Sequence, residues 1–287
     1  MSDATRTREN TAIVVDSTAD LPDVLLADPN LSMVPLNVHF NDDTFRDWVD
    51  IRPREFYARL RKAPKLPTTS QPSAGSFIEV YRGLKERFDH IYSIHLSGKL
   101  SGTLASATLA QDEVEGVTVL DSQVVTVAIA LLAQRLLVRL GAGTTHDEIV
   151  AYVERYRRES GRLFVLDTLE YLQKGGRIGR ASGMAGSLLN IKPLLTFTEG
   201  EVDAYKKVRG ERKAMAAMID YFTSRTVPDR PVHTAMAHAD APARAEEMLR
   251  LVRATGRKVD PVLLGEVGSV IGTYAGPGAV ALFFIQE

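Results

Sequence analysis

The chain contains no cysteine among its 287 residues and no marked excess of charge of either sign. Without cysteine, disulfides, thiol nucleophiles and thiolate metal sites are all excluded. The formal net charge is −1, from 35 Lys and Arg against 36 Asp and Glu. Because net positive charge drives binding to a phosphate backbone, and no helix-turn-helix signature is present, we expect no nucleic-acid partner and disfavour a transcriptional regulator.

Long hydrophobic runs are also missing. The most apolar segment, Val124–Ala133, is ten residues long and includes Thr126. A membrane-spanning helix needs about 20 apolar residues, so this segment is expected to be a buried helix. The first ten residues are polar and carry no apolar stretch of a secretory signal. We therefore expect a globular protein of the cytoplasm.

Strand and helix patterns alternate along the first half of the chain. Such alternation predicts a parallel sheet with helices on both faces. The expected elements are a strand at Thr11–Asp16, a helix from Phe77 to Phe88, a strand at Ile91–Leu96, a helix from Leu104, a strand at Val117–Asp121 and an apolar helix toward Leu140. Thr144 or Thr145 is suited to cap the helix that follows.

The second half begins with a new strand and contains a hairpin. We expect strands at Leu163–Asp167 and Val232–Ala237, a hairpin of Leu194–Thr198 with Val202–Val208, helices at Glu211–Phe222 and Pro242–Thr255, and strands on both sides of Tyr274–Gly278. The fold is thus predicted as α/β in two lobes. Residues 11–160 form a parallel-sheet lobe, and residues 161–287 form a lobe with a mixed sheet.

Three segments concentrate glycine and small hydroxyl residues where we expect strands to pass into helices. They are Pro67–Ser73, Leu96–Thr103 and Gly272–Gly278. Open α/β sheets bind ligands at the carboxyl ends of their strands, and helix starts favour anions. The second segment is therefore a candidate for a carboxylate or phosphate site. For any one segment taken alone, helix capping and turn formation are the better explanation.

Signals for a metal or a catalytic nucleophile are weak. His233 and His238 lie five residues apart in an expected strand, which places them on opposite faces, so we predict no metal site. Neither a phosphate-binding loop of the form GxxxxGK[ST] nor a GxSxG motif occurs. Asp16 and Asp20 flank Ser17 and Thr18, which suits a capping turn better than a metal site with a phosphate.

The segment Gln173–Gly186 combines five glycines with Lys174, Arg177 and Arg180. Two interpretations are open. It is either an exposed loop leading into a helix at Ser187, or a basic, mobile cover over a site that also docks an acidic partner or an anionic membrane.

Several short motifs occur together in one order. They are Val15–Pro22, Val34–Phe40, Pro67–Ser73, Ser97–Thr103, Leu169–Ile178, Asn190–Pro193 and Lys207–Gly210. With these motifs the chain, from Ala12 to Phe284, resembles the DegV family of fatty-acid-binding proteins, which includes the acyl-binding subunit of bacterial fatty-acid kinase.

This resemblance implies two α/β lobes, with a long-chain fatty acid as ligand and its acyl tail mainly in the C-terminal lobe. The carboxyl group would be held between the lobes by the hydroxyls of Thr69 and Ser97 and by the backbone N–H of Gly98. Family members often carry histidine before the final Gly-Pro-Gly, where this chain has Tyr274. A phenol donates a hydrogen bond but does not titrate near neutral pH as imidazole does.

The resemblance further implies a carrier with no catalytic residue and no cofactor. A partner kinase would phosphorylate the bound carboxyl group to an acyl phosphate. Arg177 and Arg209 are candidates for contacts with that phosphate or with the partner, and transient contact with a membrane surface fits the same role.

An enzyme is the main alternative to a carrier. It would act on a small phosphorylated or carboxylated metabolite, with Ser97 as nucleophile or Asp16 as metal ligand. Against it, no histidine is clearly placed as a base beside Ser97.

For the carrier, residues Gly175 to Gly186 are expected to open for loading, so that alanine at Gly179 and Gly183 would slow lipid exchange.

Overall fold

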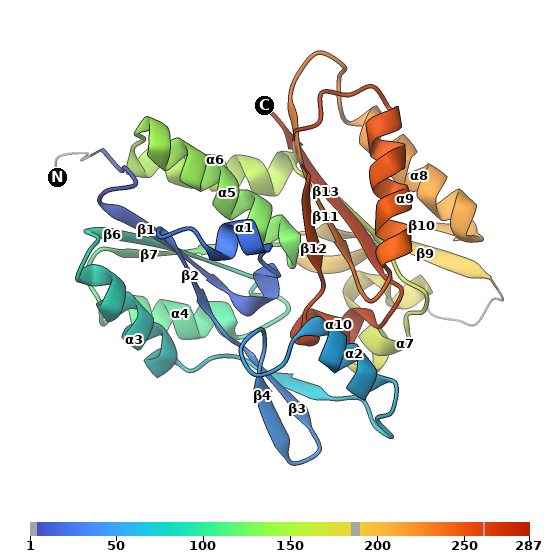
Figure 1. Cartoon of the computed structure of the whole chain (residues 1–287), viewed down its shortest axis with the longest axis horizontal. Coiled ribbons are helices and arrows are strands. Elements are labelled where there is room, and N and C mark those ends of the chain that lie inside the picture. Colours follow the sequence, from blue (N-terminus) through green and yellow to red (C-terminus); the bar gives the residue numbers. More distant parts are fainter. Residues whose placement is uncertain (1–4, 185–189, 261) are drawn as a thin grey trace.

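The computed structural model describes residues 5–184, 190–260 and 262–287. Its N-terminal part is built on a parallel four-stranded sheet of order β2-β1-β6-β7 (Figure 1). The strands are β1 (Thr11–Asp16), β2 (Leu31–Val34), β6 (His90–His95) and β7 (Val117–Asp121). The prediction of a parallel sheet from the alternating pattern is confirmed.

Helices cover both faces of this sheet (Figure 1). They are α3 (Ala74–Lys85), α4 (Thr103–Gln111) and α5 (Val127–Ala142). On one face α3 and α4 bury Phe77 and Ala107 against Val14, whereas on the other α5 packs on Ile13 and Ile94. Because neighbouring residues of a strand point to opposite faces, Ile13 and Val14 serve two different cores.

The C-terminal part is built on a mixed six-stranded sheet of order β10-β9-β8-β13-β11-β12. Only the pair β11–β12 is parallel; the remaining pairs of this sheet are antiparallel. The strands are β8 (Gly161–Val165), β9 (Ile191–Thr198), β10 (Glu201–Arg209), β11 (Val232–His238), β12 (Leu263–Glu266) and β13 (Val280–Gln286). The expected hairpin is confirmed as β9–β10, with Glu199 and Gly200 at positive φ in its turn.

The two faces of the six-stranded sheet meet different partners. Helices α8 (Glu211–Ser224) and α9 (Pro242–Ala254) cover one face. Along β13, Leu282 and Phe284 point to these helices, whereas Ala281 and Phe283 point to the opposite face, toward the core that contains α5. The alternation of a half-buried strand is thus used to build two separate cores.

A third, antiparallel sheet of order β4-β3-β5 was not predicted from the sequence. Its strands are β3 (Asn37–Phe40), β4 (Asp43–Arg46) and β5 (Thr68–Ser70). The hairpin of β3 and β4 projects away from the larger sheets (Figure 1). These strands have only three or four residues and are largely polar, so their local signal is weak even where β3 alternates.

The remaining helices are short, with the exception of α6. They are η1 (Ser17–Ala19), α1 (Asp23–Leu26), α2 (Pro53–Leu60), α6 (His146–Glu159), α7 (Glu170–Lys174), η2 (Gly179–Met184) and α10 (Ser269–Ala275). The prediction that one of the two threonines caps α6 is confirmed for Thr145, which also forms a capping box with Glu148.

The strand expected just before Tyr274–Gly278 is wrong. Strand β12 ends at Glu266, and residues 269–275 form α10, so the segment links a helix to β13. A short apolar run such as Val270–Ile271 does not distinguish a helix from a strand. The helix starts at Ser269 because Asp47 accepts the backbone N–H of that residue.

The division of the chain at residue 160 stays a prediction. Strand β8 does begin at Gly161, but α5, which precedes it, contacts β11, β12 and β13 as well as β1 and β6. One helix therefore packs on both large sheets.

Candidate functional site

An apolar cavity of about 370 Å³ lies on the face of the six-stranded sheet that α8 and α9 leave free. Its volume is in the range typical of small-molecule sites, about 300–1,000 Å³. Phe164, Phe197 and Phe283 line it from the sheet, Leu172 from α7 and Ile271 from α10. The loops after β2, β6 and β7 complete the wall. The cavity thus lies between elements from both halves of the chain.

Small residues in one row of the sheet give the cavity its floor. Across the strands, Phe164 of β8 pairs with Ala281 of β13, and Ala281 pairs with Ala237 of β11. All three line the cavity. A methyl group fills far less space than the leucine or phenylalanine found at neighbouring positions, so the two alanines leave room that larger side chains would occupy.

Polar side chains gather at one end of the cavity. The hydroxyl of Thr69 on β5 lies 2.6 Å from the phenol oxygen of Tyr274 on α10. The guanidinium of Arg177 lies over the Tyr274 ring, 5.1 Å from its centroid. Gln71 and Ser101 also line the cavity. This end presents hydroxyl, amide and guanidinium donors, which suits an oxyanion.

Two of the residues expected to hold a carboxyl group do not line this cavity. Ser97 is fully buried, and its hydroxyl donates to the carbonyl of Gly200 in the β9–β10 turn at 2.7 Å. The N–H of Gly98 points to a carboxylate oxygen of Asp121, 3.4 Å away. Their predicted role stays untested, and here Ser97 ties the loop after β6 to the C-terminal sheet.

The two arginines predicted to contact phosphate or a partner are placed differently. Arg177 lines the cavity and donates to the carbonyls of Leu100 and Gly175. Arg209 is exposed at the end of β10 and lies away from the cavity. Thr69, Tyr274 and Arg177 are therefore brought together, and Arg209 is not.

Sequence reasoning missed Gln71, Ser101 and the alanines of the floor. Gln71 and Ser101 lie inside two hydroxyl-rich segments that the sequence had singled out, so those segments were the right signal. Ala281 interrupts a strand that otherwise carries mostly large apolar side chains, and Ala237 is its partner on β11. That interruption is the signal for a cavity, but it gains meaning only when the register of β11 and β13 is known.

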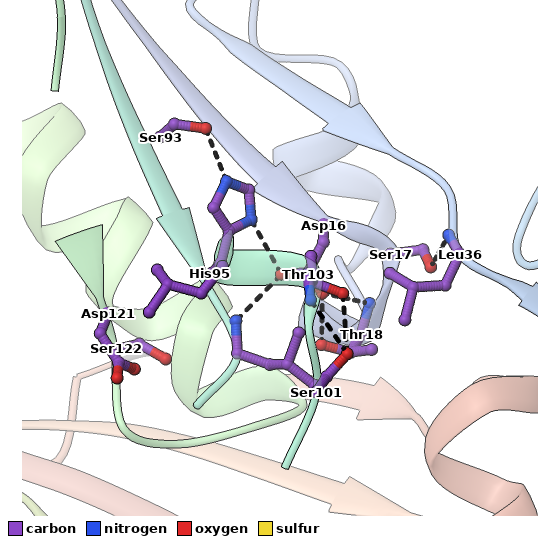
Figure 2. A network of polar contacts seen from close by, with 12 residues as sticks. Asp16, Ser17, Thr18, Leu36, Ser93, His95, Ser101, Thr103, Asp121 and Ser122 are labelled. Carbon is purple, nitrogen blue, oxygen red and sulfur yellow. Dashed lines mark hydrogen bonds and ion pairs between the residues drawn. The ribbon is translucent and has the colours of Figure 1, made fainter. Parts of the chain in front are cut away.

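The alternative enzyme would need a base beside Ser97, and His95 is engaged elsewhere. Figure 2 shows the imidazole of His95 between Ser93 and Asp16, at 2.7 Å and 3.0 Å. The hydroxyl of Tyr81 donates to Ser93 at 2.7 Å. Serine, histidine and aspartate are in contact here, as in a hydrolase, but all three are fully buried and the serine is hydrogen-bonded on both sides. No substrate carbonyl can reach Ser93, and both ring nitrogens of His95 are occupied.

Asp16 has no free oxygen for a metal. Its Oδ1 accepts from the N–H and hydroxyl of Thr18, and its Oδ2 accepts from His95 and from the N–H of Leu96 (Figure 2). The capping interpretation is confirmed, because Asp16 caps η1. Within the described ranges, no three His, Asp or Glu side chains converge as metal ligands would.

A pair of buried carboxylates, Asp20 and Asp47, holds the start of α10. Asp20 accepts from the N–H of Gly268 at 2.9 Å and from Thr126 at 2.7 Å, and Asp47 accepts from the N–H of Ser269 at 2.9 Å. Burial raises the pKa of Asp20 well above its usual range, and the neighbouring Asp47 raises it further. Burial also raises the pKa of Asp47, to about 6. These carboxylates fix the helix that carries Tyr274.

Asp47 is expected to make folding less favourable above pH 6. Its Oδ2 has no hydrogen-bond partner among the described residues, so the ionised form is poorly compensated. The folded pKa is raised above the unfolded value, so the folded state binds the proton more tightly and stability rises as the pH falls from about 6 toward about 4. Asp47→Asn keeps an acceptor for Ser269 and should raise the free energy of unfolding at pH 8 by roughly 1–3 kcal/mol.

Urea unfolding at pH 8 and at pH 4.5 tests this expectation. The gain from Asp47→Asn should shrink strongly at the lower pH, because the wild-type carboxyl is then protonated as well. Asp43→Asn, on the exposed strand β4, is the matched control. Equal effects of Asp47→Asn at the two pH values would contradict the argument.

The glycine-rich segment is largely exposed, but it contains two short helices and one buried residue. Residues 170–174 form α7 and residues 179–184 form η2, in which Ala181 is fully buried. Lys174 pairs with Glu170, and Arg180 pairs with both Glu199 and Glu201. These pairs offset the positive charge of Lys174 and Arg180. The helix expected to start at Ser187 lies outside the described residues.

The remaining predictions concern histidine and the membrane. His233 and His238 do lie on one strand, β11, and His233 lies 2.6 Å from Asp260. In the described part of the chain, no helix has both the length and the apolar character that crossing a membrane requires.

A comparison with known protein families assigns the chain to one of them. A family model described as "Uncharacterised protein, DegV family" matches residues 10–287. The chain belongs to the DegV family. The motifs that suggested this resemblance, including the loops that carry Thr69 and Ser101, all lie within the matched region.

Three relatives illustrate the DegV similarity. A protein of Thermotoga maritima named "Fatty acid-binding protein" is 36% identical over 276 residues, which are 93% of this chain and 95% of that protein. A structure titled "Fatty Acid Binding of a DegV family Protein from Thermus thermophilus" superposes with a TM-score of 0.93 and 36% identity, covering 97% of this chain and 100% of that one. A stearic acid-binding protein of Eubacterium ventriosum superposes with a TM-score of 0.86 and 26% identity, covering 96% and 98%.

Proposed function

We propose that this DegV-family chain binds a long-chain fatty acid, with the acyl tail in the apolar cavity and the carboxylate at its polar end. The observation that carries the proposal is the pairing of an apolar cavity of about 370 Å³ with hydroxyl and guanidinium donors at one end. A fatty acid has the same division between a long apolar tail and one oxyanion. The fatty-acid ligands named for the relatives support the same assignment.

Burial of the tail supplies the affinity in this proposal. A chain of about fourteen methylenes gains roughly 11 kcal/mol on burial, at about 0.8 kcal/mol for each methylene. Ordering the tail and immobilising the ligand offset a large share of that gain. The floor formed by Ala237 and Ala281 provides the space for this burial.

The polar end must compensate the buried carboxylate. An ionised carboxyl group without partners is costly in an apolar site, so several donors have to converge on it. Thr69 and Tyr274 each offer a hydroxyl, and Arg177 adds a positive charge beside the Tyr274 ring. We propose these three residues as carboxylate ligands, with Ser97 and Gly98 shaping the loop that carries Ser101.

We further propose that the chain presents its ligand to a kinase in a partner protein. That enzyme would transfer the γ-phosphoryl group of ATP to the carboxylate, giving an acyl phosphate and ADP. The polar end of the cavity is lined by the partly exposed Tyr274 and the exposed Arg177, so a partner can approach it. Arg209 would contact the partner. The protein would act in the cytoplasm as a carrier of two lobes, divided near residue 160. Loading of the fatty acid would involve transient contact with a membrane.

Mass spectrometry of an organic extract of the purified protein tests the central proposal. A stoichiometric long-chain fatty acid is the expected result. A protein that carries none, and that takes up no added palmitate, would overturn the proposal. If palmitate uptake is lost in a variant with a larger side chain in the cavity, such as Ala281→Leu, the ligand is assigned to this cavity rather than to the surface.

Release of the ligand is expected to depend on the contact between η2 and β10. Gly179 in η2 has φ +52°, and a Cβ there would lie 2.6 Å from the carbonyl oxygen of Val202, which lines the cavity. The left-handed conformation costs an L-residue roughly 1–2 kcal/mol. Gly179→Ala should therefore weaken the closed state and speed ligand release roughly tenfold, the opposite of the slowing expected from the sequence.

Gly183→Ala is the matched control, because a Cβ at Gly183 meets no atom within 4 Å. Stopped-flow transfer of a fluorescent fatty acid to albumin measures both rates. If Gly179→Ala releases the ligand no faster than the wild type, opening at η2 does not limit exchange.

A further inference from the structure

A chain of four buried polar side chains joins helix α3 to strands β6 and β1. The phenol of Tyr81 on α3 donates to Ser93 at 2.7 Å, and Ser93 lies 2.7 Å from Nε2 of His95. Nδ1 of the same ring lies 3.0 Å from Oδ2 of Asp16 (Figure 2). All four side chains are fully buried, and none of them lines the apolar cavity. They can therefore act on a ligand only through the elements that they hold.

The hydrogen bonds of this chain all run toward Asp16. A carboxylate only accepts, so Nδ1 of His95 donates to Asp16 and carries the ring proton. Ser93 already accepts from Tyr81, so its own hydroxyl proton is donated to Nε2 of His95. Each group is satisfied in this one arrangement, which fixes the His95 ring and, through it, the Asp16 carboxylate.

Asp16 in turn fixes the loop between β6 and α4. Its Oδ2 accepts the N–H of Leu96 at 2.9 Å, where this loop begins. The loop lines the apolar cavity with Leu96, Leu100 and Ser101. The carbonyl of Leu100 also accepts from Nε of Arg177 at 3.3 Å, and the Arg177 side chain is otherwise exposed. The position of the loop therefore sets the position of the guanidinium at the polar end.

The imidazole is the donor to Asp16 that comes from a side chain of the neighbouring strand. The other side-chain donor, Thr18, belongs to the turn that Asp16 itself caps. Loss of the imidazole would leave an acceptor site of a buried carboxylate unsatisfied, which is costly. The carboxylate would then turn away from its present orientation and weaken its bond to the N–H of Leu96.

We propose that His95 is a positioning residue for ligand binding, which orients Asp16 and thereby holds the loop of residues 96–102 and Arg177 in place for the carboxylate. This inference rests on the proposed function. Arg177 distinguishes a charged headgroup from a neutral one, whereas the apolar cavity binds the tail of either. Removing the contact between His95 and Asp16 is therefore expected to weaken palmitate more than hexadecanol.

Three substitutions of His95 separate positioning from packing. His95→Asn keeps an amide near the place of Nδ1 and can still donate to Asp16, His95→Gln carries its amide farther out toward Ser93, and His95→Leu has none. Each removes the ring that packs edge-on against Phe77, 5.0 Å between centroids, so all three should lower the stability. Ser93→Ala keeps that packing and frees Nε2, so it should show the same selectivity with a smaller loss.

Isothermal titration with palmitate and hexadecanol measures the effect. His95→Leu and His95→Gln should weaken palmitate about tenfold more than hexadecanol, the loss typical of a hydrogen bond to a charged group. His95→Asn should bind palmitate within about threefold of the wild type, less than a neutral hydrogen bond usually contributes. Thr226→Val is the control for stability alone, because it removes a buried hydrogen bond to Phe222 just after α8, outside the cavity.

The ¹⁵N signals of the His95 ring test the direction of the chain, with a protonated Nδ1 and an unprotonated Nε2 as the expected result. A proton on Nε2 alone would overturn the inference. So would equal losses for palmitate and hexadecanol, which would make His95 a support of the whole cavity, and so would a loss in His95→Asn as large as in His95→Leu. Wild-type protein that binds neither ligand would overturn the proposed function, and this inference with it, whereas the other outcomes leave the function intact.

Discussion

Replacing Ala281 with leucine is expected to weaken palmitate binding roughly 50-fold. The side chain of Ala281 faces the cavity between Phe164 and Ala237 in the same row of the sheet. Leucine adds three carbon atoms to the floor and so displaces about three methylenes of the ligand. At about 0.8 kcal/mol for each methylene, the loss is about 2.4 kcal/mol.

Titration of myristate, palmitate and stearate measures the effect, and the loss should grow with chain length. Ala204→Leu makes the same substitution at an exposed position of β10 outside the cavity and should leave the affinities unchanged. The free energy of unfolding separates cavity filling from overpacking, because overpacking would lower it by about 1–3 kcal/mol. Undiminished stearate binding in a stable Ala281→Leu protein would contradict the assignment of the tail to this cavity.

Much of the two large sheets could be predicted because several of their strands have a clear local signature, whereas β2 was not predicted. β1 and β7 are apolar runs followed by polar residues, and the β9–β10 hairpin has a glycine turn. The sheet of β3, β4 and β5 could not be predicted, because its stability comes from pairing between segments 31 residues apart, such as Val38 with Thr69. No local pattern reports such pairing.

The candidate site could be predicted only in part, because local sequence identifies its loops but not how their side chains are oriented. The segments that carry Thr69 and Tyr274 were singled out by their glycine and hydroxyl residues, and the family resemblance indicated the two residues themselves. Their contact joins residues 205 positions apart. Ser97 has the same kind of surroundings, yet its hydroxyl turns to Gly200 rather than into the apolar cavity. Residue type and neighbourhood therefore indicate which loops form a site, and the direction of each side chain depends on what packs against it.

The buried acids illustrate a further limit. Asp47 lies between β4 and α2 in a stretch that mixes charged and apolar residues, and nothing local predicts that it is only 1% exposed. Its burial results from the packing of α10, more than 200 residues later, onto the loop that follows β4. Carboxylates of this kind become visible only through tertiary structure.

Removing both hydroxyls at the polar end should cost more affinity for palmitate than the two single variants together. In the free protein Thr69 and Tyr274 hydrogen-bond to each other at 2.6 Å. A bound carboxylate would replace that one bond with two charge-assisted ones, each contributing roughly 1.5–3 kcal/mol. Thr69→Val or Tyr274→Phe removes one bond to the ligand but also removes the mutual bond that binding must break, so each single loss is partly offset.

In the double variant this offset applies once, whereas in the two single losses added together it applies twice, so the double loss should exceed the summed single losses by about 1 kcal/mol, the usual contribution of a neutral hydrogen bond. Its total loss should be roughly 2–5 kcal/mol, or at least about thirtyfold in affinity. Hexadecanol, with a neutral headgroup, is the control ligand and should lose much less. Losses that simply add would mean that the carboxylate does not come between Thr69 and Tyr274, and recognition would then fall to Arg177 alone.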